Sequence, residues 1–434
     1  MPIPLLLRQA SVAAWTLTMA AAVARSAPRD WKHEDGRTVQ GTLIGVERGR
    51  AMLVGANGRQ AAVELENLSA EDRRWIDEWE SGRKPEDVLP PITWPAAVTQ
   101  PLPRIEGPAP ENGGSVFRTV HYRFVADAEL STSAVQDFAT VAEATWKLLE
   151  AWPLPPSEKS RALLEVRIFR RRDEYQSAGG PPETAGVFMG SFGSSGALLV
   201  PFESLGIEAF QGRFTKGAAY HPRVLIHEMT HQIYAPLIRL LPLWLNEGLA
   251  EYIALIPYKN GTFHLGRAAI ITALRQRIED HRLRDPGRTG VFGSKDAPAE
   301  TWTMPLTQLF QIDDADPGLR QGSLLEKHRA YFTSLLVVFY LLHFDGDSQA
   351  RGLRLCLDQV AELQRRRRGR SSAASLPQGW TPADASSLGR IREKVTAQLR
   401  GERQTGAFET EIRKKFAGLG VKIDFHPEGS EISN

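Results

Sequence analysis

Cysteine is almost missing from the sequence. The 434 residues include one cysteine, Cys356. A single thiol cannot form a disulfide within the chain, so the fold must be stabilised by its apolar core. A cysteine-rich structural zinc site is excluded for the same reason. Cys356 lies in the apolar run 353–357, which predicts a buried, chemically inert side chain rather than a nucleophile.

The chain also lacks an excess of charge. It carries 53 lysines and arginines against 51 aspartates and glutamates, a formal net charge of +2. This balance indicates no class of charged partner. An arginine run at residues 365–368, followed by Arg370, contains no interleaved aromatic residue. We interpret the run as part of a solvated loop and predict no nucleic-acid partner.

No stretch of the sequence is apolar for long enough to make a comfortable membrane span. The stretch from about Ala10 to Ala24 is apolar and uncharged, but it is shorter than the roughly 20 residues that a spanning helix needs. Arg8 precedes it, and small residues at 22, 24 and 26 offer cleavage sites. Residues 1–26 are therefore predicted to be a bacterial-type signal peptide of an exported, periplasmic or extracellular protein. An uncleaved anchor or a frayed helix is the alternative.

Residues 29–80 have the pattern of a small β-barrel. Short β-rich runs at 38–44, 51–54 and 61–65 are separated by turn signals at Asp35-Gly36, Gly49 and Asn57-Gly58. Asp-Gly and Asn-Gly pairs favour two-residue turns of type I′. Ser69 is placed to cap a short helix. Several short strands joined by tight turns predict a small barrel.

This segment resembles the SLA1 homology domain 1 family, whose fold is an SH3-like barrel. The resemblance covers about an eighth of the chain and rests on Arg29-Asp30-Trp31, Asp35-Gly36-Arg37, Gly41 and Leu68-Ser69-Ala70-Glu71-Asp72. Some members of that family bind short peptides, so the resemblance implies a peptide ligand for the barrel as one role. A structural or cell-surface spacer is the other.

Residues 81–115 are rich in proline. The segment carries eight prolines and ends in Gly113-Gly114. Proline has no backbone N–H and fixes its own φ, so this composition disfavours helix and sheet and favours an extended chain. We interpret the segment as a linker between two domains.

The region 116–345 is predicted to be an α+β domain. Alternation predicts strands at 121–125 and 163–169, two short runs predict a hairpin at 186–200, and apolar residues at helical spacing run from 132 to 152. Helices follow from residue 222 onward, among them an apolar core helix at 331–342. This order predicts helices packed beside a mostly antiparallel sheet. Residues 346–434 are predicted to form a helical extension.

The strongest chemical signal is the run His227-Glu228-Met229-Thr230-His231. Residues four apart share one face of a helix, with about 5–6 Å between their Cβ atoms, so the two histidines can bind one metal ion. Glu228 lies beside the first histidine and can reach a metal-bound water without binding the metal. This is the arrangement that the H-E-x-x-H motif provides. A chance pair of core or surface histidines is the less favoured interpretation.

A second motif offers the remaining ligand. A catalytic zinc ion has three protein ligands and keeps its fourth position for water. Glu247 follows Asn246 after a loop with two prolines, and a helix running back beside the first would bring it to the metal. Glu251, one turn further, is predicted to accept a hydrogen bond from a ring N–H of His227 or His231. A solvated helix face is the alternative, but apolar residues surround both glutamates in the sequence.

Together these motifs resemble those of the gluzincin metallopeptidases. In that clan the first motif supplies two zinc ligands and the catalytic glutamate, and Asn-Glu-Gly supplies the third ligand. The resemblance implies Zn²⁺ bound by His227, His231 and Glu247, with Glu228 as general base and a zincin-like fold. More closely, residues 116–345 are similar to a bacterial peptidase-like family of unknown substrate, often called DUF1570. That likeness rests on the runs 224–231 and 243–252.

The clan also implies a second donor to the reacting oxygen, a tyrosine or histidine that follows the ligand glutamate. The candidates are His328, Tyr331 and Tyr340; we prefer Tyr331, which is expected to open the helix at 331–342. A core tyrosine without a chemical role is the alternative. The resemblance further implies that substrate adds as a strand along the hairpin at 186–200. The clan's Gly-x-Met-Glu-Asn aminopeptidase motif is missing, which disfavours exopeptidase action at an N-terminus.

These observations predict an exported zinc peptidase that hydrolyses a peptide or protein substrate. Two alternatives stay open: a zinc hydrolase of a non-peptide bond, and a non-catalytic binding or cell-surface module with a residual fold. Glu228 argues against the second, because binding alone does not need this glutamate.

Overall fold

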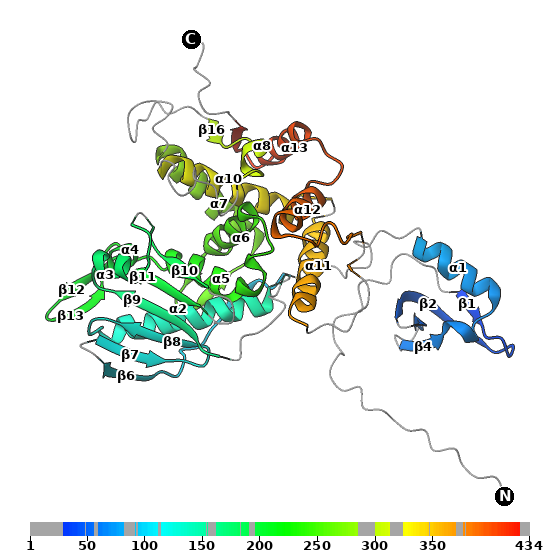
Figure 1. Ribbon diagram of the computed structural model, residues 1–434, viewed down its shortest axis with the longest axis horizontal. Coiled ribbons are helices and arrows are strands. Elements are labelled where there is room, and N and C mark those ends of the chain that lie inside the picture. Colours follow the sequence, from blue (N-terminus) through cyan, green and yellow to red (C-terminus); the bar gives the residue numbers. More distant parts are fainter. Residues whose placement is uncertain are drawn as a thin grey trace, which may run out of the picture. The chain divides into compact units, whose positions relative to one another are not determined.

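The structure of the protein is a computed structural model. The chain divides into two compact units, Met1–Ile92 and Thr93–Asn434 (Figure 1). The residues described are 29–425 apart from 48, 56–59, 82–91, 93, 112–113, 153, 155–161, 183, 191–195, 285–299, 313–323, 347, 370–375 and 378. The predicted signal peptide at 1–26 and the Asn57-Gly58 turn lie outside them. Each unit is described by itself.

The first unit is a four-stranded antiparallel sheet in the order β1-β2-β3-β4, followed by helix α1. A short 3-10 turn, Leu65–Asn67, precedes the helix. The apolar core gathers Trp31, Leu43, Leu53, Leu68 and Ile76, each at most 3% exposed. The bounds are β1 Arg29–Lys32, β2 Thr38–Glu47, β3 Arg50–Val54, β4 Gln60–Glu64 and α1 Ala70–Ser81.

Most of the sequence predictions for this unit are confirmed. The three β-rich runs form β2, β3 and β4, and Ser69 caps α1, since its Oγ accepts from the Asp72 N–H at 3.2 Å. Gly49 turns the chain between β2 and β3 with φ +79°. The type I′ turn predicted at Asp35-Gly36 is wrong: Gly36 alone has a positive φ, and the connection runs over five residues.

The second unit is built on a six-stranded mixed sheet in the order β10-β11-β9-β8-β7-β6. Three of its five pairings are antiparallel, and β9 pairs in parallel with both β8 and β11. The predicted strands and the hairpin are confirmed as β8, β9, β10 and β11. The bounds are β6 Glu106–Glu111, β7 Gly114–Arg118, β8 Tyr122–Ala126, β9 Leu164–Phe169, β10 Val187–Met189 and β11 Ala197–Pro201.

The interpretation of residues 81–115 as a linker without sheet is wrong for its second half. Strand β6 pairs with β7 inside the main sheet, and β5 pairs with β15 in a small sheet of order β14-β15-β5. The boundary between the units falls at Ile92. The bounds are β5 Ala97–Thr99, β14 Tyr258–Lys259 and β15 Thr262–His264. A second hairpin pairs β12 Ile207–Phe210 with β13 Arg213–Lys216.

Helices cover the main sheet and then stack on one another, which confirms an α+β fold. Helices α2 and α5 contact each other and the sheet, α6 packs on α5, and α10 packs on α6 (Figure 1). Apolar side chains line these contacts, as the helical spacing at 132–152 predicted for α2. The bounds are α2 Thr132–Ala151, α3 Arg172–Ser177, α4 Phe202–Leu205, α5 Arg223–Ile238, α6 Leu243–Leu255, α7 Arg267–Arg284, α8 Leu306–Leu309 and α10 Leu324–His343.

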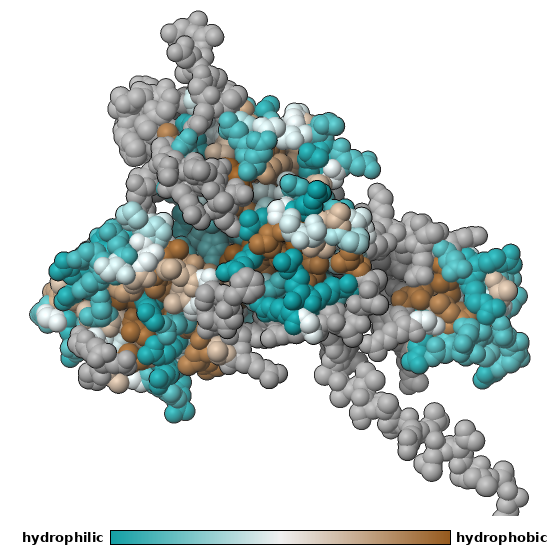
Figure 2. Space-filling model, in the orientation of Figure 1, coloured by the Kyte–Doolittle hydropathy of each residue, from teal (hydrophilic) through white to brown (hydrophobic). Residues whose placement is uncertain are grey.

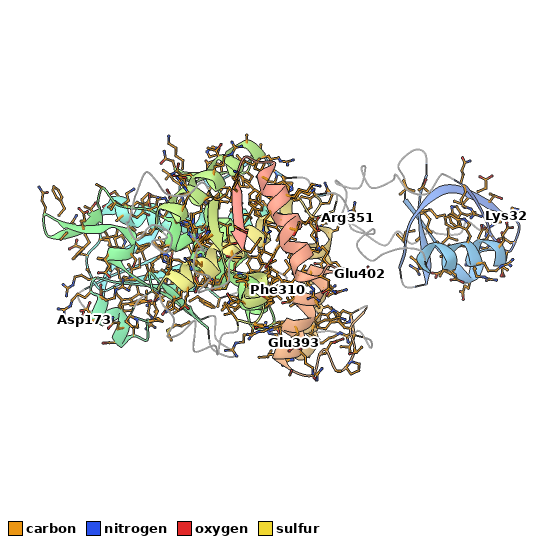
Figure 3. The ribbon with its side chains drawn as sticks, turned by 90° about the horizontal axis from the view of Figure 1, so that it is seen from above. Lys32, Asp173, Phe310, Arg351, Glu393 and Glu402 are labelled. Carbon is orange, nitrogen blue, oxygen red and sulfur yellow. The ribbon has the colours of Figure 1, made fainter. Side chains whose placement is uncertain are left out.

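The region after residue 345 is helical as predicted, but it belongs to the second unit. Its last strand pairs in parallel with β16, and Trp244 of α6 donates to Thr396 of α12 at 3.1 Å. Phe310, labelled in Figure 3, contacts the same Trp244 side chain, with 5.3 Å between ring centroids and 50° between the ring planes. The bounds are α11 Arg351–Arg367, α12 Leu388–Arg400, α13 Thr405–Ala417, β16 Glu300–Thr303 and β17 Lys422–Phe425.

Two further sequence predictions concern exposure. Cys356 is fully buried, which confirms that prediction, and burial raises the pKa of its thiol to about 12, which disfavours the reactive thiolate. The loop predicted for the arginine run is wrong, because Arg365, Arg366 and Arg367 form the last turn of α11; Arg367 and Arg368 are exposed, and Arg370 lies outside the described residues. The outward surface over α11 is largely hydrophilic in the space-filling view (Figure 2). None of the helices in the described ranges is long and apolar enough to cross a membrane.

Candidate metal centre

The first motif lies in the middle of α5. Pro222 precedes the first turn, where a missing N–H costs nothing, and Leu225, Ile226 and Met229 are buried, which fixes the rotation of the helix. His227 and His231 follow one another by one turn on the face toward α6. The predicted helix and its shared histidine face are therefore both present.

The second motif lies in α6, which returns beside α5 after the connection 239–242. Almost the whole helix is buried, including Glu247 at 9% and Glu251 at 7% exposure. A solvated face, the alternative for the two glutamates, is thus excluded. Gly248 allows α10 to approach closely, because a Cβ at that position would lie 2.5 Å from the Ser334 carbonyl oxygen.

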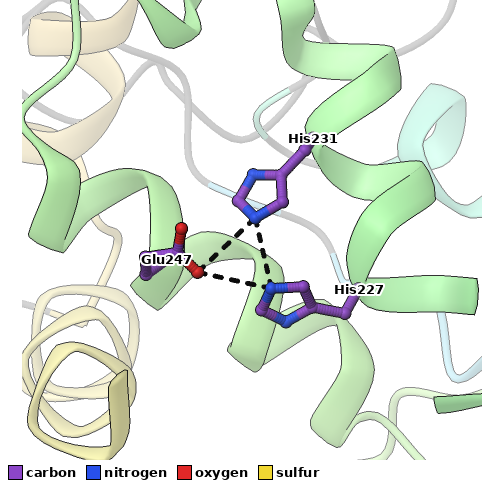
Figure 4. Close-up of side chains that lie close together, drawn as sticks. All are labelled: His227, His231 and Glu247. Atoms are coloured by element: carbon purple, nitrogen blue, oxygen red, sulfur yellow. Dashed lines mark hydrogen bonds and ion pairs between the residues drawn. The ribbon is translucent and has the colours of Figure 1, made fainter. Parts of the chain in front are cut away.

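Three ligand atoms converge between the two helices. His227 Nε2 and His231 Nε2 lie 3.2 Å apart, and Glu247 Oε2 lies 3.3 Å from the first and 3.5 Å from the second (Figure 4). Ligands at about 2.0–2.1 Å from a tetrahedral ion are separated by about 3.3–3.4 Å. The spacing of the three atoms fits one tetrahedral ion with its fourth position left open.

The surroundings of Glu247 Oε2 also fit a bound metal ion. Glu247 Oε2 is buried and accepts no hydrogen bond from the residues that the structure describes. A buried carboxylate oxygen without a donor costs free energy. A cation bound by the three atoms would satisfy this oxygen, and two imidazoles with one carboxylate are a donor set that suits zinc.

The charges within the cluster are strongly coupled. Burial acts to raise the pKa of Glu247, but the positive charge of His231 and the contacts with His227 outweigh it and lower the pKa to about 2. Burial acts in the opposite sense on His227, yet Glu247 and Glu251 raise its pKa to about 10. The cluster therefore favours positive charge at its centre, which a divalent cation supplies as well as a proton does.

Glu228 lies outside the trio, beside the edge strand of the sheet. Burial raises the pKa of its carboxyl group, against the lowering effect of the charges on His227 and His231. A Cβ on Gly186 would lie 3.2 Å from Glu228 Cγ, and the Phe188 backbone is close enough to lower the carboxyl pKa through a hydrogen bond. This placement leaves Glu228 next to β10 and next to the histidines.

Glu251 contacts His227, as the sequence predicted for one of the two histidines. Its Oε1 lies 3.4 Å from His227 Nδ1, the ring nitrogen that faces away from Glu247. Its Oε2 accepts from the guanidinium groups of Arg223 and Arg277, the second at 3.3 Å. Burial acts to raise the pKa of Glu251, but these arginines and His227 hold it well below its usual range.

Of the three candidate donors, the described contacts place Tyr331 against the cluster. Its ring lies over the His227 ring, with 6.5 Å between centroids and 24° between planes. Tyr340 is buried elsewhere, where its hydroxyl donates to Glu411, and His328 is exposed. The expectation that Tyr331 opens its helix is wrong, because α10 begins seven residues earlier, at Leu324.

The sequence predictions missed three residues around the cluster: Gly186, Arg223 and Arg277. Arg223 stands four residues before His227, so the helical spacing offered a signal for it. Arg277 is 26 residues from Glu251 and shows no local pattern. Comparison with known families and proteins adds nothing here, since no protein-family model and no curated protein matches the chain significantly.

Proposed function

We propose that this chain is a zinc-dependent peptidase in which His227, His231 and Glu247 hold the metal and Glu228 is the general base. The convergence of three ligand atoms at tetrahedral spacing, close to the separate carboxylate of Glu228, carries the proposal. It agrees with the gluzincin resemblance of the two motifs, and we extend it to a zincin-like fold for the second unit, whose mixed sheet and packed helices are α+β.

Glu228 supplies the proton chemistry. Zinc, when bound, lowers the pKa of a coordinated water toward roughly 7 and polarises the scissile carbonyl. Glu228 takes the proton of the attacking water and later passes it to the leaving amine. Its raised pKa suits a group that must both accept and return a proton.

Two other parts of the site would bind substrate. Strand β10 is an edge strand of the main sheet, so an extended peptide can add to it through backbone hydrogen bonds beside Glu228. The Tyr331 ring lies beside the His227 ring, which supports Tyr331 as the donor to the reacting oxygen. We extend the proposal to an exported, periplasmic or extracellular protein whose first unit is an SH3-like barrel that binds a peptide or acts as a spacer.

A purified full-length sample tests the proposal. Metal content is measured by mass spectrometry, and cleavage of a mixed peptide library is followed with and without a chelator, for the wild type and for Glu228→Gln. Cleavage that the chelator and the variant both abolish supports the proposal. Zinc binding without cleavage of any peptide indicates a non-peptide substrate or a binding module instead. A protein that binds no zinc refutes the metal centre.

A further inference from the structure

Three helices meet at the carboxylate of Glu251. Arg223 comes from α5, Glu251 from α6 and Arg277 from α7, and the three side chains are 27%, 10% and 18% exposed. Both guanidinium groups donate to Oε2, and Oε1 is left facing His227 Nδ1 at 3.4 Å. The two oxygens of one carboxylate thus face different partners.

This division of partners orients the first metal ligand. A buried carboxylate is costly unless it is paired and hydrogen-bonded, and here two arginines supply both. With Oε2 occupied, Oε1 is the oxygen that faces His227, 3.4 Å from Nδ1, and it favours a proton on that nitrogen. A proton on Nδ1 leaves the lone pair on Nε2, the atom that lies 3.3 Å from Glu247 Oε2.

We propose that Arg223 and Arg277 are positioning residues of the metal centre. They fix Glu251, and through it the ring orientation and tautomer of His227, without touching metal or substrate themselves. The inference rests on the proposed zinc site. It also assigns a role to α7, which carries neither motif.

Zinc affinity measured by competition with a chromophoric chelator tests the role of Arg277. We expect Arg277→Met to weaken zinc binding by about 10–100-fold, the usual effect of losing such a partner of a ligating histidine, and Arg277→Lys to restore part of it. The matched control is Arg275→Met: Arg275 lies on the same helix, is exposed, and donates to the Leu419 carbonyl. We expect that control to bind zinc like the wild type.

A double-variant cycle separates positioning from a general loss of structure. If Arg277 acts through Glu251, adding Arg277→Met to Glu251→Gln weakens zinc binding further by less than about twofold. Equal weakening in both backgrounds overturns the positioning role, as does unchanged affinity of Arg277→Met in a wild type that binds zinc. A wild type that binds no zinc overturns the metal centre itself.

Circular dichroism of the zinc-free proteins shows whether each variant folds. Should Arg277→Met fail to fold, Arg223→Gln replaces it in the same cycle with Glu251→Gln. The expected and contradicting results are the same, because Arg223 donates to the same oxygen.

Discussion

Two histidine–glutamate clusters in the second unit differ in how their carboxylates are paired. In one, Glu143 of α2 accepts from the backbone N–H of His121 at 2.9 Å and contacts its Nδ1 at 2.6 Å. In the other, two imidazole nitrogens and one carboxylate oxygen converge without a hydrogen bond to that oxygen from the described residues. The carboxylate of the first cluster is hydrogen-bonded by the protein itself, whereas the ligand oxygen of the second has no such donor among the described residues, and we propose that a cation occupies this place.

The largest difference expected between the two clusters is the effect of a Glu→Gln substitution on kcat. Glu228→Gln should lower kcat for a cleaved peptide by about 10²–10⁴-fold, the usual contribution of a general base, and should leave zinc content unchanged because Glu228 is not a ligand. Glu143→Gln, the same substitution in the other cluster, should keep kcat. Full activity of Glu228→Gln would show that another group moves the proton.

Removing a transition-state donor should have the next largest effect. We expect Tyr331→Phe to lower kcat by about 10²–10³-fold with little change in KM, because its hydroxyl would act on charge that develops only during reaction. Tyr340→Phe is the control, since its hydroxyl is engaged by Glu411 and Arg403. Steady-state kinetics on one fluorogenic peptide compare the two; an unchanged kcat for Tyr331→Phe makes it a packing residue.

Zinc should stabilise the protein by binding to His227, His231 and Glu247, and the His121–Glu143 pair should make no contribution to this effect. At a free zinc concentration of 100 Kd, binding adds about 2.7 kcal/mol to the free energy of unfolding. We expect this gain for the wild type and for His121→Ala, and none for His231→Ala, which lacks a ligand. Denaturant unfolding with zinc and with chelator measures it. A zinc-dependent gain in His231→Ala would place the metal elsewhere.

The His121–Glu143 pair should respond to pH instead of to metal. Burial acts to raise the pKa of Glu143, but hydrogen bonds from His121 and Thr119 outweigh it and lower the pKa from its usual value. A lowered folded-state pKa stabilises the fold above the unfolded value and loses this contribution as the pH falls through the folded one. Glu143→Gln should therefore cost about 1–3 kcal/mol near neutral pH and less as the pH falls through the lowered pKa of Glu143. A pH-independent difference in unfolding free energy would contradict this.

Local pattern was enough to predict the parts of the site that lie on two adjacent helices. The spacing of His227 and His231 predicted a shared face, and buried neighbours predicted that Glu247 and Glu251 point inward. Arg277 was not predicted, because its contact with Glu251 depends on how α7 packs against α6, and no local sequence pattern indicates this packing.

The strands in the proline-rich segment 81–115 were not predicted, for a different reason. Proline is excluded from central strands but tolerated at sheet edges, where its missing N–H faces away from the ladder. Strand β6 carries Pro108 and Pro110 and is the last strand of its sheet, and β5 is likewise at an edge. Composition alone could not reveal that position. The parallel pairings of β9 were likewise hidden, because they join strands far apart in the sequence.

X-ray absorption at the zinc edge of purified protein tests the central claim most directly. The account predicts one zinc ion per chain with nitrogen and oxygen neighbours at about 2.0–2.1 Å, the scattering signature of two imidazoles, and loss of that signature in His231→Ala. A protein that holds no zinc after exposure to excess metal, or a zinc shell without imidazole, would contradict it.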